Sequence, residues 1–130
     1  MSTPCHIQSQ PWKGDLIRVD LRGSLRAESI PDLDREFARH FAEGHSSFVI
    51  YLDQLTLLSL AGGAALVGQL RLAQERGGSV TLVQPAPEIE EIFGILGVLP
   101  LLHIVRDTTE LLGAGSTKRN LPRVDSPNEP

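Results

Sequence analysis

The chain has 130 residues, 41% hydrophobic and 22% charged, which is the composition of one globular domain. Its formal net charge of −4, with scattered basic residues, argues against a nucleic-acid-binding protein. The single cysteine, Cys5, excludes an intrachain disulfide, and the four histidines are too dispersed for a zinc site. No signal peptide is visible and no apolar stretch reaches the roughly 20 residues of a membrane helix. We therefore expect a cytoplasmic protein with no metal, no cofactor and no direct membrane insertion.

The N-terminal part predicts a pair of strands. Residues 6–12 alternate weakly, and residues 15–22 alternate strictly from Val19 onward, which indicates a strand with one wet face. Lys13-Gly14 is the predicted turn between them. Gly23 is predicted to end the second strand.

Strands and helices then alternate. Residues 30–43 repeat apolar side chains every fourth position and predict an amphipathic helix. The apolar run 48–52 predicts a strand covered on both faces. Further helices are expected at 60–76, after Pro85 and Pro87, and at 108–112; further strands at 79–83 and 102–105.

This order predicts an α/β domain over residues 1–113. Strand–helix–strand units with buried strands imply parallel pairing, so we expect a mixed sheet of four or five strands packed by about four helices. Residues 114–130 have Leu121 and Val124 as their only large apolar groups, and we expect a disordered C-terminal tail there.

Three segments, taken in order, carry a resemblance. They are Gly23-Ser-Leu-Arg26 with Pro31-Asp-Leu33, then Leu55-Thr-Leu-Leu-Ser-Leu-Ala-Gly62, then Arg76-Gly-Gly-Ser-Val-Thr-Leu-Val83 followed by residues 93–99. Together they resemble the STAS domain, the family of bacterial anti-sigma-factor antagonists, over roughly residues 10–112.

The resemblance implies a regulatory binding module and not an enzyme. In the family, the second serine of an Asp-Ser-Ser-Gly motif is phosphorylated by a partner kinase that is also an anti-sigma factor. The unphosphorylated form binds that kinase and frees the sigma factor for transcription. The implied docking site is the loop and helix start at residues 57–64. Its partner-binding residues would be Leu58, Ser59, Leu60, Ala61, Gly62 and Gly63.

The sequence departs from the family pattern at this site. Ala61 occupies the phosphoacceptor position and has no hydroxyl, so phosphorylation there is impossible. Leu60 replaces the preceding serine, Ser59 stands in place of the aspartate, and Arg26 replaces the other characteristic aspartate. Ser59 is either a substitute phosphoacceptor or a helix cap, and we favour the cap.

Other interpretations stay open. The chain could be a non-enzymatic accessory subunit of a transporter or stress-signalling assembly, or a small-ligand sensor, and it could form a homodimer. Gly62-Gly63 could cradle a phosphate, but close packing of the helix start explains the pair better. The apolar run 98–102 fits a core plug better than an exposed patch.

Overall fold

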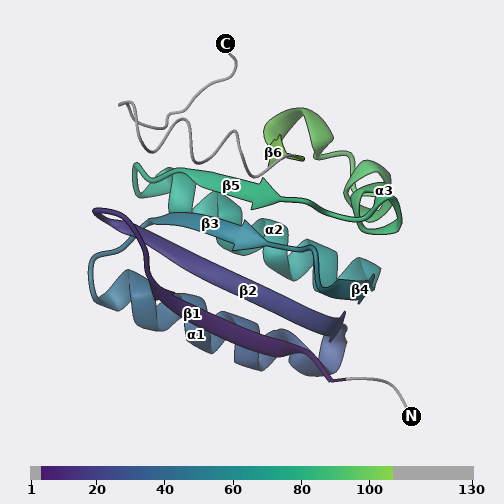
Figure 1. Ribbon diagram of the computed structural model, residues 1–130, viewed down its shortest axis with the longest axis horizontal. Coiled ribbons are helices and arrows are strands. Elements are labelled where there is room, and N and C mark those ends of the chain that lie inside the picture. The colour runs from purple at the N-terminus through teal and green to yellow at the C-terminus, as the bar shows by residue number, and fades with distance from the viewer. Residues whose placement is uncertain (1–3, 107–130) are drawn as a thin grey trace.

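A six-stranded mixed sheet organises the computed structural model, which describes residues 4–106 (Figure 1). The strand order is β1-β2-β3-β5-β6, and β4 pairs with β2 off this path. β1 pairs antiparallel with β2, and the remaining pairs are parallel. The strands are β1 (His6–Pro11), β2 (Leu16–Leu25), β3 (Ser47–Tyr51), β4 (Leu55–Leu58), β5 (Val80–Val83) and β6 (His103–Val105).

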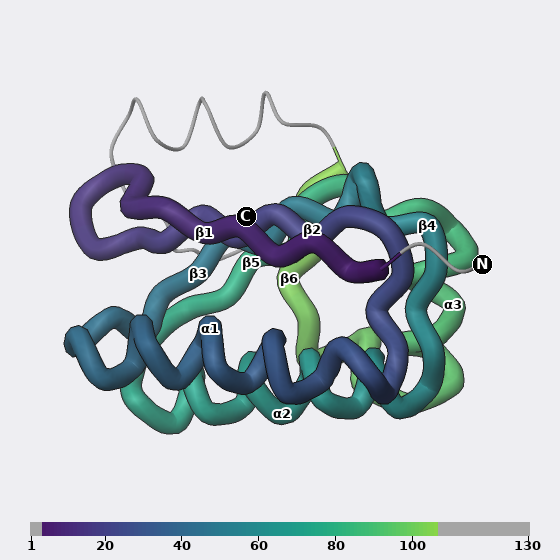
Figure 2. Tube along the Cα trace, turned by 90° about the horizontal axis from the view of Figure 1, so that it is seen from below, coloured from purple at the N-terminus to yellow at the C-terminus, as the bar shows by residue number. Residues whose placement is uncertain are grey.

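The two longest helices cover one face of the sheet. α1 (Ile30–Ala42) and α2 (Leu60–Glu75) lie side by side under the strands in Figure 2, each connecting parallel strands. α3 (Pro87–Ile95) lies at the end of the sheet, beside β4. Two short 3-10 turns complete the described elements: η1 (Ala27–Ser29) and η2 (Leu99–Leu101).

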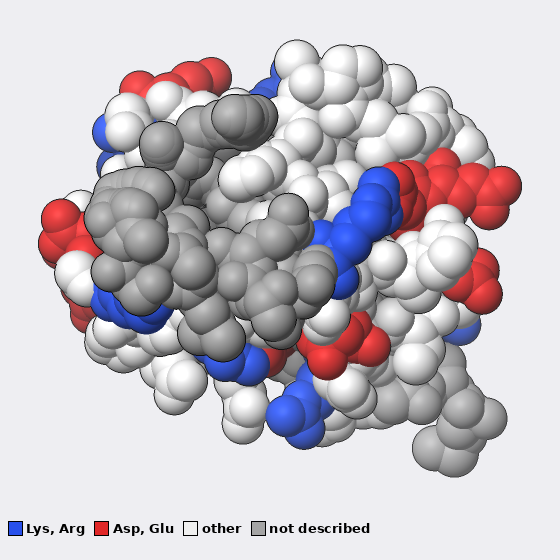
Figure 3. Space-filling view, turned by 45° about the horizontal axis from the view of Figure 1, so that its top comes forward, with Lys and Arg blue, Asp and Glu red and all other residues white. Residues whose placement is uncertain are grey.

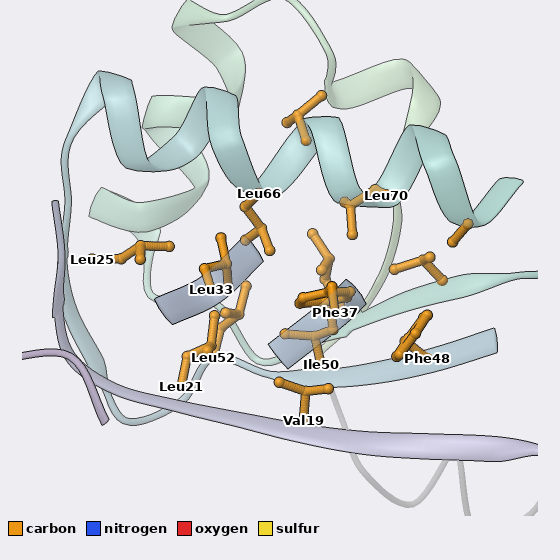
Figure 4. Packing of buried hydrophobic residues seen from close by; sticks show 14 of the residues in the cluster. Val19, Leu21, Leu25, Leu33, Phe37, Phe48, Ile50, Leu52, Leu66 and Leu70 are labelled. Atoms are coloured by element: carbon orange, nitrogen blue, oxygen red, sulfur yellow. The ribbon is translucent and has the colours of Figure 1, made fainter. Parts of the chain in front are cut away.

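The core forms where the inward side chains of the strands meet the apolar stripes of α1 and α2 (Figure 4). Strand alternation places Val19 and Leu21 of β2 against Ile50 and Leu52, all 1% exposed or less. Each such side chain stabilises the fold by about 1.5–3 kcal/mol relative to an exposed one. The helices contribute Leu33 and Phe37 from α1 and Leu66 and Leu70 from α2.

The predicted order of elements through the last described strand is confirmed except for one added strand, β4, and one boundary is corrected. β2 does not end at Gly23 but runs on to Leu25. Gly23 has a φ of 87°, and the pairing register shifts between Gly23 and Ser24. At this point β2 changes partner, from β3 before the glycine to β4 from the glycine onward.

The sheet has six strands where four or five were expected, because Leu55–Leu58 forms an unpredicted strand. Leu55 and Leu58 are buried while the two residues between them are exposed, so this strand lacks simple alternation. The predicted helix at 108–112 and the tail at 114–130 lie outside the described residues. Within residues 4–106, no helix is both long and apolar enough to span a bilayer.

Candidate functional site

The junction between β4 and α2 lies at the carboxyl ends of the parallel strands, beside α3 (Figure 1). Ser59 is the N-cap of α2: its Oγ accepts a hydrogen bond from the Gly62 N–H at 2.9 Å. The Ser59 N–H donates to the Leu25 carbonyl at 3.0 Å, which ties the junction to the end of β2. The predicted capping role of Ser59 is confirmed.

The apolar residues of the junction divide into anchors and exposed side chains. Leu58 is 4% exposed and packs in the core. Leu60 is 50% exposed, Leu57 is 37% exposed, and Ala61 also faces solvent. Of the six predicted docking residues, Leu60 and Ala61 therefore expose their side chains to solvent, whereas Leu58 packs in the core.

Gly62 and Gly63 are buried; packing excludes a side chain at Gly62 and leaves little room for one at Gly63. A Cβ on Gly62 would lie 2.4 Å from the Leu25 carbonyl oxygen, a contact that no side chain tolerates. A Cβ on Gly63 would lie 3.0 Å from Ile92 Cγ2 and 3.1 Å from Leu96 Cδ1, both at α3. The glycine pair lets the start of α2 approach β2 and α3 closely, which supports the packing explanation over a phosphate cradle.

Arg26 lies beside the capped helix start. Leu25 pairs with Leu58 across β2 and β4, so Arg26 and Ser59 directly follow two paired residues. The Arg26 side chain is partly buried, and its Nε is buried with no hydrogen-bond partner. The sequence analysis identified Arg26 as a departure from the family pattern, and the fold places it at the β4–α2 junction.

A second apolar area lies next to the junction. Residues 92–105 contain no Asp, Glu, Lys or Arg, and Figure 3 shows a broad uncharged area on the side where α3 and η2 lie. The run 98–102 contains both buried and exposed residues. Val98 is 5% exposed and packs in the core, whereas Leu101 is 61% exposed. The expected core plug therefore accounts for only part of this run.

A polar cluster around buried His40, on the opposite side of the domain, was missed from the sequence. His40 is 4% exposed, and its Nε2 lies 2.7 Å from Ser9 Oγ, which also donates to Glu36. Burial lowers the pKa of His40 below its ordinary 6.5. The cluster joins β1 to α1, and its partners are about 30 residues apart in sequence, so no local motif marks it. Residues 4–106 hold no group of three or more potential metal ligands.

A family model described as "Mlab, STAS domain" matches residues 9–103. The chain belongs to the STAS domain family. The resemblance drawn from the three sequence segments is thus confirmed. A search among curated proteins finds no match.

Solved structures of anti-sigma factor antagonists share the fold. Unphosphorylated SpoIIAA, an anti-sigma factor antagonist, superposes with a TM-score of 0.72 at 14% identity, covering 88% of this chain and all of that one. An antagonist from Mycobacterium paratuberculosis gives 0.73 at 17% identity, covering 88% and 97%. A putative antagonist from Thermotoga maritima gives 0.70 at 15% identity, covering 82% and 92%. At such identities the likeness establishes the α/β fold and leaves the partner open.

Proposed function

We propose that this STAS domain is a regulatory binding module that docks an anti-sigma factor with serine kinase activity through residues 57–64. The observation that carries the proposal is the exposure of Leu60 and Ala61 on a rigid, capped helix start. The role is one of binding and needs no catalytic group. The antagonist structures that share the fold support the class of partner.

Exposed leucines supply the apolar contact area of this surface. Leu57 lies near the end of β4 and Leu60 is the first residue of α2, so the two leucines flank the Ser59 cap. Burying exposed apolar surface against a partner contributes about 25 cal/mol per Å² before the costs of association. Since the backbone between them is fixed by the Ser59 cap and the Gly62 packing, little ordering is needed on binding.

The missing hydroxyl at Ala61 changes how the complex is regulated. A phosphate on Ser59 would replace the hydroxyl proton that Oγ donates to the Leu25 carbonyl at 3.4 Å and would place negative charge beside that carbonyl oxygen. We therefore propose that binding is not released by phosphorylation in this loop. Incubation with a bound kinase and ATP, followed by mass spectrometry of the peptide spanning 57–64, should find no phosphate; a phosphorylated Ser59 would contradict this.

A matched pair of leucine variants tests the docking surface. Leu60 and Leu72 both lie on α2, with exposed fractions of 50% and 39%, at opposite ends of the helix. Leu60→Asp should abolish binding to a kinase-type anti-sigma factor from the same genome, measured by calorimetry, whereas Leu72→Asp should bind as the wild type does. Equal binding by both variants, or no complex with any such factor, would refute the proposal.

A second candidate is a non-enzymatic accessory subunit of a transporter or stress-signalling assembly. The observation that favours it is the same absent acceptor: an interface without a hydroxyl at position 61 suits permanent assembly. Stable co-purification with a membrane ATPase, and none with a sigma-factor regulator, would select this role.

A further inference from the structure

The docking surface is uncharged over an unusually long segment. From Gln54 to Leu70 the chain contains no Asp, Glu, Lys or Arg, and the first turn of α2 has no acidic residue. Acidic side chains are favoured at that position because they offset the positive end of the helix dipole. Their absence leaves the start of α2 with its partial positive charge unopposed by a local carboxylate.

Arg26 adds a full positive charge at the edge of this surface. It follows Leu25, whose carbonyl accepts the Ser59 N–H and lies 2.4 Å from where a Gly62 Cβ would be. No carboxylate oxygen within residues 4–106 lies within 4.0 Å of the Arg26 guanidinium. Glu28, two residues later in sequence, and Asp53, just before β4, are both exposed and make no ion pair with Arg26.

The Arg26 side chain also lacks hydrogen-bond partners inside the protein. Its Nε is buried without an acceptor, which is a costly arrangement for a charged donor. A planar guanidinium is suited to bidentate contact with a carboxylate. Arg26 is therefore a cation with no internal counter-ion, one residue after the Leu25–Leu58 pair at the junction that carries exposed Leu57 and Leu60.

From this arrangement we infer that the partner presents an acidic side chain to Arg26, next to an apolar area that receives Leu57 and Leu60. The inference rests on the docking role proposed above and specifies the chemistry of its partner. The unpaired charge of Arg26 also selects against a partner that offers a cation there. Arg26 is thus a specificity-determining residue of the interface.

Charge variants inside and outside the proposed docking surface distinguish a specific contact of Arg26 from a general effect of net charge. Arg26→Asp should weaken the complex with an anti-sigma factor that binds wild type but not Leu60→Asp, by about tenfold or more, and slow its association. Arg71→Asp makes the same charge change at an exposed position on α2, roughly 16 Å along the helix from Leu60. It should change the affinity for the partner by less than about twofold. Arg26→Gln, with an intermediate loss, serves if the aspartate variant unfolds, which thermal unfolding would reveal.

The reciprocal change in the partner identifies the contact. Single Asp or Glu to Lys changes in the anti-sigma factor should include one that restores binding to Arg26→Asp while weakening wild type. If both Arg26 variants bound the partner as tightly as wild type does, while Leu60→Asp abolished binding, the inference would be overturned and the docking role would stand. If the affinity were also unchanged by Leu60→Asp, or if no complex formed, the docking role and the inference would both be refuted.

Discussion

The two ends of the helical layer are held in place by opposite means. At the β4–α2 junction the backbone is fixed by the Ser59 cap and by glycines packed against β2 and α3, so Leu60 and Ala61 remain free to face solvent. At the β1–α1 contact the polar side chains themselves make the contact, because buried His40 and half-buried Glu36 both bond to Ser9. At the junction the side chains stay available for binding because the packed backbone, and not the side chains, holds the surface in place.

The largest expected effect comes from adding one methyl group at the junction. Gly62→Ala would place a Cβ 2.4 Å from the Leu25 carbonyl oxygen, and we expect a loss of about 2–3 kcal/mol in unfolding free energy. Gly68→Ala is the matched control on the same helix, since its Cβ meets nothing within 4 Å. That variant should gain about 0.5–1 kcal/mol. Denaturant unfolding of both measures the contrast, and similar effects would contradict the close-packing account.

Removing the helix cap should have a smaller effect. Ser59→Ala deletes the oxygen that accepts the Gly62 N–H, and we expect about 1 kcal/mol lower stability. Ser59→Thr keeps an acceptor and should lose less. Chemical denaturation separates the two variants. If Ser59→Ala were as stable as wild type, the serine would be free for another role, such as phosphorylation.

The β1–α1 contact should show a pH dependence that the junction lacks. Because burial lowers the pKa of His40 below 6.5, the unfolded chain binds its proton first as the pH falls. Stability should therefore decrease as the pH drops from 7 through 6.5 and below. In His40→Gln, the difference in unfolding free energy between pH 7 and pH 5 should shrink. An unchanged difference would show that His40 is not responsible.

Most of the fold could be predicted because it depends on local periodicity. The four-residue repeat of 30–43 predicts α1, and the apolar run 48–52 predicts β3. β4 was missed because Leu55 and Leu58, its buried residues, are three positions apart, as in a helix or an irregular loop. Gly23 was read as a strand end, whereas its positive φ lets one strand change partner.

The candidate site was predictable in place but not in detail. The motif around Ala61 located the junction, and the spacing of Ser59 before α2 indicated its capping role. Sequence could not separate buried Leu58 from exposed Leu60, because both are leucines and their exposure depends on β2 and α3. The Ser9–His40 contact joins residues 31 positions apart and left no local pattern.

The most direct test of the docking account is an amide NMR titration of the wild-type chain with the anti-sigma kinase that it binds. The account predicts shifts or broadening concentrated at residues 57–64 and at Arg26, with the amides of β1 and α1 around Ser9 and His40 unaffected. Perturbations confined to β1 and α1, with residues 57–64 unchanged, would contradict it.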